Sequence, residues 1–127
     1  MKVLLDTHVF LWWNTSSQKL SKRVMELFHD PETTLLLSHV SVWEIQIKSQ
    51  LGKLALPVPL LTLIEQQRNG IELLPITINH IVGIGSLPNL HGDPFDRLLI
   101  AQARTENASL ITDDHWIRQY AVTTIWS

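Results

Sequence analysis

The chain has 127 residues, a length typical of one domain with one core, and 45% of its residues are hydrophobic. It contains no cysteine, which excludes a disulfide framework, a zinc–cysteine site and a thiol nucleophile. The 10 basic and 12 acidic residues leave a net charge of −2, so the basic excess usual for a protein that grips a nucleic-acid backbone is missing.

The N-terminal region predicts neither export nor membrane insertion. The first acid, Asp6, comes too early for the apolar region of a signal peptide. No apolar run approaches the roughly 20 residues that a membrane span needs. We therefore expect a cytoplasmic protein that makes no contact with membranes.

The first half of the chain alternates short apolar runs with helical patterns. The first run ends abruptly at Asp6, as a buried parallel strand does. Hydrophobic residues recur at helical spacing from Leu20 to Phe28, and Gly52 is placed to end a later helix. The expected order is a strand over residues 2–5, a helix over 8–13, a helix over 17–29, a strand over 33–37 and a helix over 41–51.

The second half continues the alternation. Asp93 followed by Pro94 is typical of a helix start, with an acidic N-cap and proline in the first turn. The expected order is a helix over 57–68, a strand over 71–76, a short helix over 79–83, a helix from Asp93 to 107, a strand over 109–112, a short helix over 115–120 and a strand over 122–126. This alternation predicts one α/β domain over residues 1–127, with a mainly parallel five-stranded sheet flanked by helices.

Four acidic residues are expected at one edge of that sheet. Asp6 and Asp114 follow the first and fourth strands. Glu44 and Asp96 are expected in the first turns of helices next to the second and fourth strands. Ligands of open α/β sheets bind beyond the carboxyl ends of the strands. We therefore expect these four carboxylates to converge there.

Each acid also has a structural explanation that the sequence leaves open. Ser41 to Glu44 fits a capping box, and Asp93 and Asp96 suit the positive end of a helix dipole. Asp6 can cap a short helix, and the pair at 113–114 can form a turn. Four such coincidences at one edge are much rarer than one, which favours a shared site.

A cluster of carboxylates points to metal chemistry. Crowded carboxylates repel one another unless a cation or a proton intervenes. Ligand sets made only of oxygen suit Mg²⁺ or Mn²⁺, and such ions activate water for phosphodiester hydrolysis. The pattern leaves open whether one or two ions bind. A mixed zinc site with His8, His91 or His115 is a weaker alternative, because their spacing matches no ligand motif.

The residues around the four acids resemble one family, the PIN domains, and more narrowly the VapC-type toxins of bacterial toxin–antitoxin pairs. The resemblance covers essentially the whole chain. Its motifs are VLLDTH at 3–8, SVWEI at 41–45, HGDPFDR at 91–97 and ITDD at 111–114.

The resemblance implies a function, a cofactor and partners. It implies a magnesium-dependent endoribonuclease with a homodimeric core, inhibited by a small antitoxin protein. The catalytic positions then fall on Asp6, Glu44, Asp96 and Asp114, with the metal held by the three aspartates.

Other residues are candidates for supporting roles. Thr7 and Thr112 can orient metal-bound water, His91 can support its loop or touch substrate, and Arg97 can contact phosphate. Asp93, in the same motif as His91 and Arg97, is a further candidate for a supporting role. The tryptophans at 12, 13, 43 and 116 can stack on bases or fill the core or an interface. Three rival functions remain: a non-catalytic interaction module, a small-molecule phosphatase and a DNA nuclease.

Overall fold

A computed structural model describes residues 1–67 and 70–127. Five strands form one sheet in the order β3-β2-β1-β4-β5, and every neighbouring pair is parallel. The expected class, one α/β domain with a parallel five-stranded sheet, is confirmed. The strands are β1 Lys2–Leu5, β2 Thr34–Ser38, β3 Glu72–Leu74, β4 Ser109–Ile111 and β5 Thr124–Ile125.

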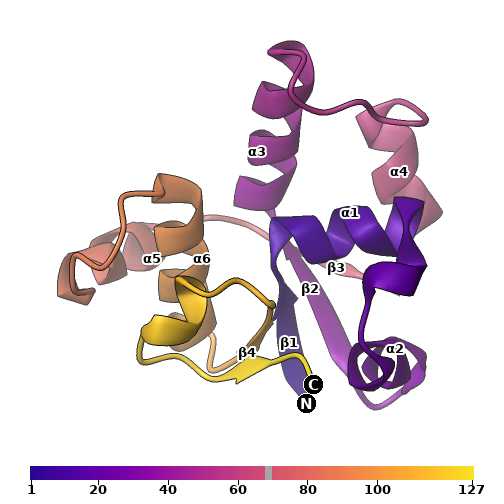
Figure 1. The fold of residues 1–127 in the computed structure, drawn as a ribbon. Coiled ribbons are helices and arrows are strands. Elements are labelled where there is room, and N and C mark those ends of the chain that lie inside the picture. The colour runs from indigo at the N-terminus through magenta and orange to yellow at the C-terminus, as the bar shows by residue number, and fades with distance from the viewer. Residues whose placement is uncertain (68–69) are drawn as a thin grey trace.

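Helices cover both faces of the sheet (Figure 1). In that view α1 and α2 lie on the right, α5 and α6 lie on the left, and α3 and α4 project upward as a pair. No helix within the described ranges is long and apolar enough to cross a membrane. The helices are α1 Thr7–Thr15, α2 Lys22–His29, α3 His39–Gln50, α4 Leu60–Gln66, α5 Ile78–Gly83 and α6 Pro94–Thr105, with 3-10 turns at Ser17–Lys19, Ile84–Ser86 and Ile117–Gln119.

The central strand β1 supplies both halves of the core because its side chains alternate between the two faces. Val3 and Leu5 pack against the α1 and α2 side, and Leu4 packs against α6. All three are fully buried. This explains why β1 is an unbroken apolar run, and it leaves Asp6 at the point where the strand leaves the sheet.

Most expected elements are confirmed, with shifted ends. The helix expected over 17–29 is wrong in one respect: a 3-10 turn precedes α2, and Ser21 separates them. Ser21 has an extended backbone, and its hydroxyl accepts a hydrogen bond from the Val24 amide, so it starts a new helix. The short helix expected over 115–120 is only the 3-10 turn at 117–119. The helix expected from 57 begins at Leu60, after Pro59, and its expected end at 68 lies outside the described residues.

The start of α3 also differs from the expectation. Its N-cap is Ser38, whose hydroxyl accepts a 3.0 Å hydrogen bond from the Val40 amide. Ser41 therefore lies inside the helix, where its hydroxyl accepts a hydrogen bond from Thr7 at 2.9 Å. The placement of Glu44 in the first turn is wrong, and so is the capping box offered for it.

Candidate active site

The four acids occupy elements that meet at the carboxyl edge of the sheet. Asp6 is the N-cap of α1, and Asp114 lies in the loop after β4. Glu44 lies in α3 and Asp96 in the first turn of α6. Charges on Glu44 and Asp114 act on the pKa of Asp6, and those on Asp6 and Asp114 act on the pKa of Asp96. The four side chains therefore share one electrostatic environment, as expected.

Asp6 is the most deeply placed of the three aspartates. It is 4% exposed, and its Oδ2 accepts a 2.8 Å hydrogen bond from the Thr112 hydroxyl. Burial raises its pKa to about 6. Within that shift, the charges of Asp114 and Glu44 act in the same direction as burial, while the Thr112 hydrogen bond and the charge of His8 act against it. A carboxylate held here is costly until a positive charge approaches it.

Asp96 is held by a chain of hydrogen bonds. Its Oδ2 lies 3.0 Å from His91 Nε2, and His91 Nδ1 lies 2.8 Å from the Tyr120 hydroxyl. Arg97 donates to the same hydroxyl at 3.1 Å. With the Tyr120 hydrogen directed at Nδ1, the tautomer that satisfies this network carries its proton on Nε2 and donates to Asp96.

Burial is the largest influence on Asp96, and it raises the pKa of this carboxyl to about 7. The charges of Asp93, Asp6 and Asp114 add to the shift, and the His91 hydrogen bond opposes it. Burial and neighbouring negative charge therefore both favour the neutral form of this carboxyl.

Asp114 is fixed by its own loop. Its Oδ1 accepts hydrogen bonds from the amides of Trp116 at 2.7 Å and Ile117 at 3.1 Å. Its amide donates to the Thr112 hydroxyl at 2.9 Å. Thr112 therefore connects Asp6 to Asp114, which gives this predicted supporting residue a definite position.

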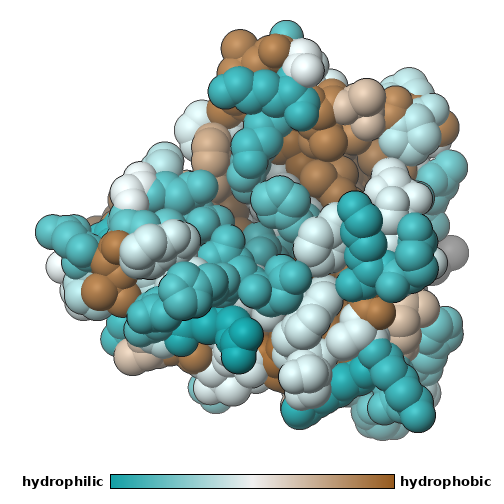
Figure 2. All heavy atoms as spheres, viewed as in Figure 1, coloured by the Kyte–Doolittle hydropathy of each residue, from teal (hydrophilic) through white to brown (hydrophobic). Residues whose placement is uncertain are grey.

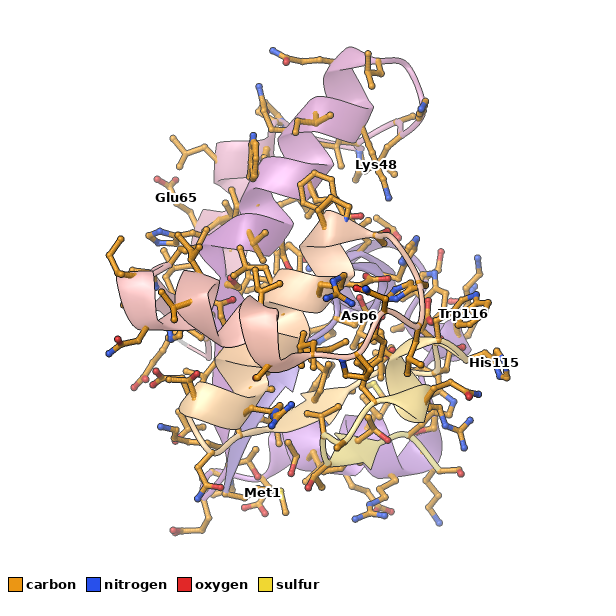
Figure 3. The ribbon with its side chains drawn as sticks, turned by 90° about the vertical axis from the view of Figure 1, so that its left-hand side faces the viewer. Met1, Asp6, Lys48, Glu65, His115 and Trp116 are labelled. Carbon is orange, nitrogen blue, oxygen red and sulfur yellow. The ribbon has the colours of Figure 1, made fainter. Side chains whose placement is uncertain are left out.

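Glu44 is only 3% exposed and pairs with Lys48 one turn later, at 2.6 Å between Oε2 and Nζ. Burial acts to lower the pKa of Lys48, but the Glu44 hydrogen bond and the charges of Glu44, Asp93 and Asp96 outweigh it and raise that pKa above its usual value. The lysine therefore brings a positive charge to the acidic edge. Figure 3 shows Lys48 above Asp6, with Trp116 to the right.

Each of the three aspartates keeps one oxygen free. Asp6 and Asp96 use Oδ2, and Asp114 uses Oδ1, in hydrogen bonds; the other oxygen of each has no hydrogen bond within residues 1–67 and 70–127. No side-chain nitrogen or oxygen in these ranges is both fully buried and without a partner, so each free oxygen keeps some contact with solvent. Hard oxygen donors of this kind fit Mg²⁺ or Mn²⁺.

The acidic side chains do not surround a common point. No three acidic or histidine side chains in the described part of the chain are arranged to hold one ion. Two of the acids are paired with basic side chains: Lys48 contacts Glu44, and His91 contacts Asp96. The donor chemistry fits a divalent cation, and the metal site itself stays a prediction.

The remaining supporting candidates are engaged in structural hydrogen bonds. Thr7 donates to Ser41, and Asp93 caps α6 by accepting from the amides of Phe95 and Asp96. Arg97 donates to the Pro88 carbonyl at 2.7 Å as well as to Tyr120, so the fold already uses its guanidinium.

The pairing of Lys48 with Glu44 and the contact of Tyr120 with His91 were not predicted from the sequence. The spacing of four between Glu44 and Lys48 is a known helical ion-pair signal and is sufficient to find the pair. Tyr120 gives no such signal, because it lies 29 residues after His91 and meets it only through the fold.

A hollow borders the acidic edge between α1 and α3. Its volume is about 270 Å³, and Leu11, Ile45 and Leu54 form its apolar wall. Thr7, His8, Lys48 and Lys53 complete its lining. Figure 2 shows hydrophobic atoms gathered beneath the projecting α3 and α4 pair, above a hydrophilic surface in the middle of the view. A larger hollow of about 470 Å³ lies at the amino ends of β2 and β3, away from the acids.

Comparison with known proteins gives a consistent result. The sequence pattern of the PIN domain matches residues 3–122. Ribonuclease VapC22 of Mycobacterium tuberculosis is 29% identical over 119 residues, which cover 93% of this chain and 91% of the relative.

Solved structures with the same fold include three VapBC assemblies. VapBC2 from Rickettsia felis, bound to a DNA fragment from its promoter, has a TM-score of 0.78 at 17% identity and covers 100% of both chains. DNA-bound VapBC from Salmonella typhimurium has a TM-score of 0.74 at 14% identity, covering 98% of this chain and 97% of the other. VapBC-1 from nontypeable Haemophilus influenzae has a TM-score of 0.69 at 19% identity, with coverage of 98% and 97%.

Proposed function

This chain belongs to the PIN-domain family, and we propose that it is the toxin of a toxin–antitoxin pair, an endoribonuclease that hydrolyses RNA phosphodiester bonds with Mg²⁺. Mn²⁺ is the expected substitute. The cytoplasm, where RNA is present, is the proposed site of action. Similarity to Ribonuclease VapC22 of Mycobacterium tuberculosis supports the activity, and similarity to the VapBC structures supports the antitoxin partner.

One observation carries the proposal: three aspartates each have one oxygen fixed by the fold and one without a hydrogen bond. Helix capping alone does not require this. A residue that only caps or turns the chain needs its bonded oxygen and gains nothing from leaving the other unpartnered at an edge where other carboxylates act on it. Burial at this edge, together with the neighbouring negative charges, raises the pKa of Asp6 to about 6 and that of Asp96 to about 7, which is the cost of that placement.

In this proposal Asp6, Asp96 and Asp114 hold the cation through their free oxygens. A bound Mg²⁺ supplies positive charge at the phosphodiester and makes its bound water more acidic. Thr112 fixes Asp6 and Asp114 relative to each other, and His91 fixes Asp96. Because the pKa of Asp96 is raised to about 7, binding of a cation by its carboxylate would be favoured as the pH rises.

Glu44 is the fourth proposed catalytic acid. It is buried, lies in the interior of α3 and pairs with Lys48, so helix capping does not account for it. We propose that its second oxygen, Oε1, orients water at the same edge. Lys48 partly neutralises the edge before the cation arrives, and it offsets the acidic net charge where RNA must bind.

The antitoxin is proposed to bind over the acidic edge and the neighbouring hollow. An apolar side chain suits the wall formed by Leu11, Ile45 and Leu54, and a basic side chain suits the acids beyond it. Such a segment covers the free carboxylate oxygens and competes with the cation. Inhibition then follows from occupancy of the site, without a change of fold.

A homodimer is proposed through α5. Ile78, Ile81 and Val82 lie on this helix at spacings of three and four residues, and they are 74%, 50% and 69% exposed. Residues so spaced share one helix face. A cluster of three exposed aliphatic side chains on a short helix suits burial against a second copy.

The experiment incubates the purified protein with total RNA and defined tRNAs, with Mg²⁺ or with EDTA, and maps the new ends. We expect cleavage at defined positions that needs Mg²⁺ or Mn²⁺. Cleavage that persists after thorough chelation contradicts the metal requirement. Cleavage of single-stranded DNA at the same rate favours the DNA nuclease, and binding without cleavage favours the non-catalytic interaction module.

A further inference from the structure

The indole of Trp116 lies at the acidic edge, stacked on the imidazole that holds Asp96. The Trp116 and His91 rings are nearly parallel, with an interplanar angle of 8° and centroids 5.9 Å apart. Trp116 is nevertheless 49% exposed. In Figure 3 it lies to the right of Asp6, toward the edge of the view. A half-exposed indole with one side against another aromatic ring presents a flat surface to solvent.

The position of this ring is coupled to two of the proposed metal ligands. The Trp116 amide donates to Asp114 Oδ1 at 2.7 Å, which fixes its backbone. The ring beneath it is fixed in turn, because His91 bonds to Asp96 and to Tyr120. Anything that stacks on Trp116 is therefore held in a defined position relative to Asp96 and Asp114.

The surroundings of the ring distinguish between two kinds of ligand. The neighbouring residues Asp113, His115, Arg118 and Gln119 are exposed and polar, so Trp116 is not part of an apolar patch. The His115 ring meets the indole edge-on, with centroids 5.7 Å apart and an interplanar angle of 66°. Protein partners usually cover wider apolar areas. A nucleobase needs only one flat π-face, and stacking tolerates any base.

We propose that Trp116, backed by His91, is a stacking platform for an unpaired nucleobase of the RNA substrate. The inference rests on the proposed function, because it places RNA at this edge. A base in a duplex is already stacked between its neighbours, so the platform selects single-stranded RNA or an unpaired loop. The base on Trp116 then fixes the adjoining phosphodiester over the acids.

The test measures RNA binding separately from cleavage. The probes are fluorescein-labelled oligo(A) and oligo(U) RNAs of roughly 12 nucleotides, within the range of single-strand sites, and the duplex formed from them. Fluorescence anisotropy is recorded in EDTA, with Mg²⁺ as a second condition, and a gel shows whether the probe stays intact.

Substitutions at Trp116 separate stacking from apolar cover. Trp116→Leu keeps an apolar cover over His91 but has no π-face, and we expect it to weaken binding of both single strands by roughly 5- to 100-fold, the loss of one stacked base. Trp116→Phe retains a π-face and is expected to recover most of the affinity. Trp43→Leu is the matched control, because Trp43 is 57% exposed but packs against Phe95. We expect it to bind RNA like the wild type.

Each outcome decides the proposal. Equal affinity of the wild type and Trp116→Leu for the single strands overturns the proposal. This is also the result expected if the ring binds a protein partner and not RNA. Equal affinity of the wild type for duplex and single strands overturns it without any variant, should Trp116→Leu fail to fold. Binding that depends on Trp116 in a protein that never cleaves RNA supports the platform and contradicts the proposed function. Normal RNA cleavage by Trp116→Leu supports the proposed function and contradicts the platform.

Discussion

Thr112 and Asp6, 106 residues apart in sequence, share a buried hydrogen bond of 2.8 Å from the threonine hydroxyl to the aspartate Oδ2. The same hydroxyl accepts a bond from the Asp114 amide at 2.9 Å. The Thr112 side chain, 0% exposed, thus forms hydrogen bonds with two of the proposed metal ligands at once. β1 and β4 are paired in the sheet, so the sheet register sets this distance.

Thr112→Val is expected to lower both stability and activity. Valine has nearly the same shape but neither donates to Asp6 nor accepts from the Asp114 amide. Groups buried without a partner cost about 1–3 kcal/mol, so the melting temperature falls. The pKa of Asp6 rises further, because the Thr112 bond lowers it in the wild type. Thr112→Ser, which keeps the hydroxyl, is the control; a valine variant as stable and active as the serine variant contradicts this role.

The raised pKa values predict how stability depends on pH in the absence of metal. Asp6 and Asp96 rise from 3.8 to about 6 and about 7, so between about pH 4 and pH 7 the folded protein binds more protons than the unfolded chain. Their contribution to stability is therefore fully present below about pH 4 and is lost as the pH rises through 6 and 7.

The difference in melting temperature between Asp96→Asn and the wild type isolates this effect from other titrating groups. In EDTA, the variant is expected to be at least as stable as the wild type at about pH 8, where the wild-type carboxylate is charged. The advantage disappears near pH 5, where Asp96 is itself neutral. A difference that is constant across this range counts against crowding of charge at Asp96.

Lys48→Gln is expected to destabilise the metal-free protein and to strengthen its response to Mg²⁺. The change leaves Glu44, only 3% exposed, without its 2.6 Å partner. It also removes the positive charge that competes with a cation at this edge. Melting curves over a Mg²⁺ titration measure both effects, and Lys53→Gln, which changes an exposed lysine of the same hollow, is the control. A smaller Mg²⁺-induced shift in Lys48→Gln contradicts the competition.

Val82→Lys is expected to weaken the proposed homodimer. A charge on the exposed face of α5 must be desolvated when a second copy covers it. Size-exclusion chromatography with light scattering at micromolar concentration measures the mass, and Leu61→Lys, at a similarly exposed position on α4, is the control. A wild type that is monomeric at this concentration, or a dimer insensitive to Val82→Lys, removes α5 as the interface.

Local patterns in the sequence are sufficient for much of the fold. The apolar run that ends on Asp6 predicts β1, and Asp93 followed by Pro94 predicts the start of α6, because strand burial and helix capping each leave a short-range pattern. The break before α2 is not predicted although Ser21 is a favourable N-cap, since the hydrophobic spacing runs through it unchanged.

Tertiary contacts explain what local patterns do not predict. Ser38 and Ser41 are both plausible N-caps for α3, and the choice follows from contacts beyond the segment: the Thr7 hydroxyl binds Ser41. This choice places Glu44 beyond the first turn. The chain of Asp96, His91 and Tyr120 joins residues brought together only by the packing of the last loop on α6, so no spacing in the sequence reveals it.

The most direct test of the proposed ribonuclease is RNA cleavage by the wild type and Asp96→Asn, measured over the same Mg²⁺ titration at about pH 8. Asparagine keeps the shape and still accepts the His91 hydrogen bond, so the fold is retained, but a charged metal ligand is lost. We expect cleavage to fall by at least about 100-fold, because a few kcal/mol of transition-state stabilisation is removed. The stabilisation of the fold by Mg²⁺ should shrink with it. An Asp96→Asn protein that melts lower than the wild type, responds normally to Mg²⁺ and still cuts RNA would contradict the assignment of this edge as a metal-dependent nuclease site.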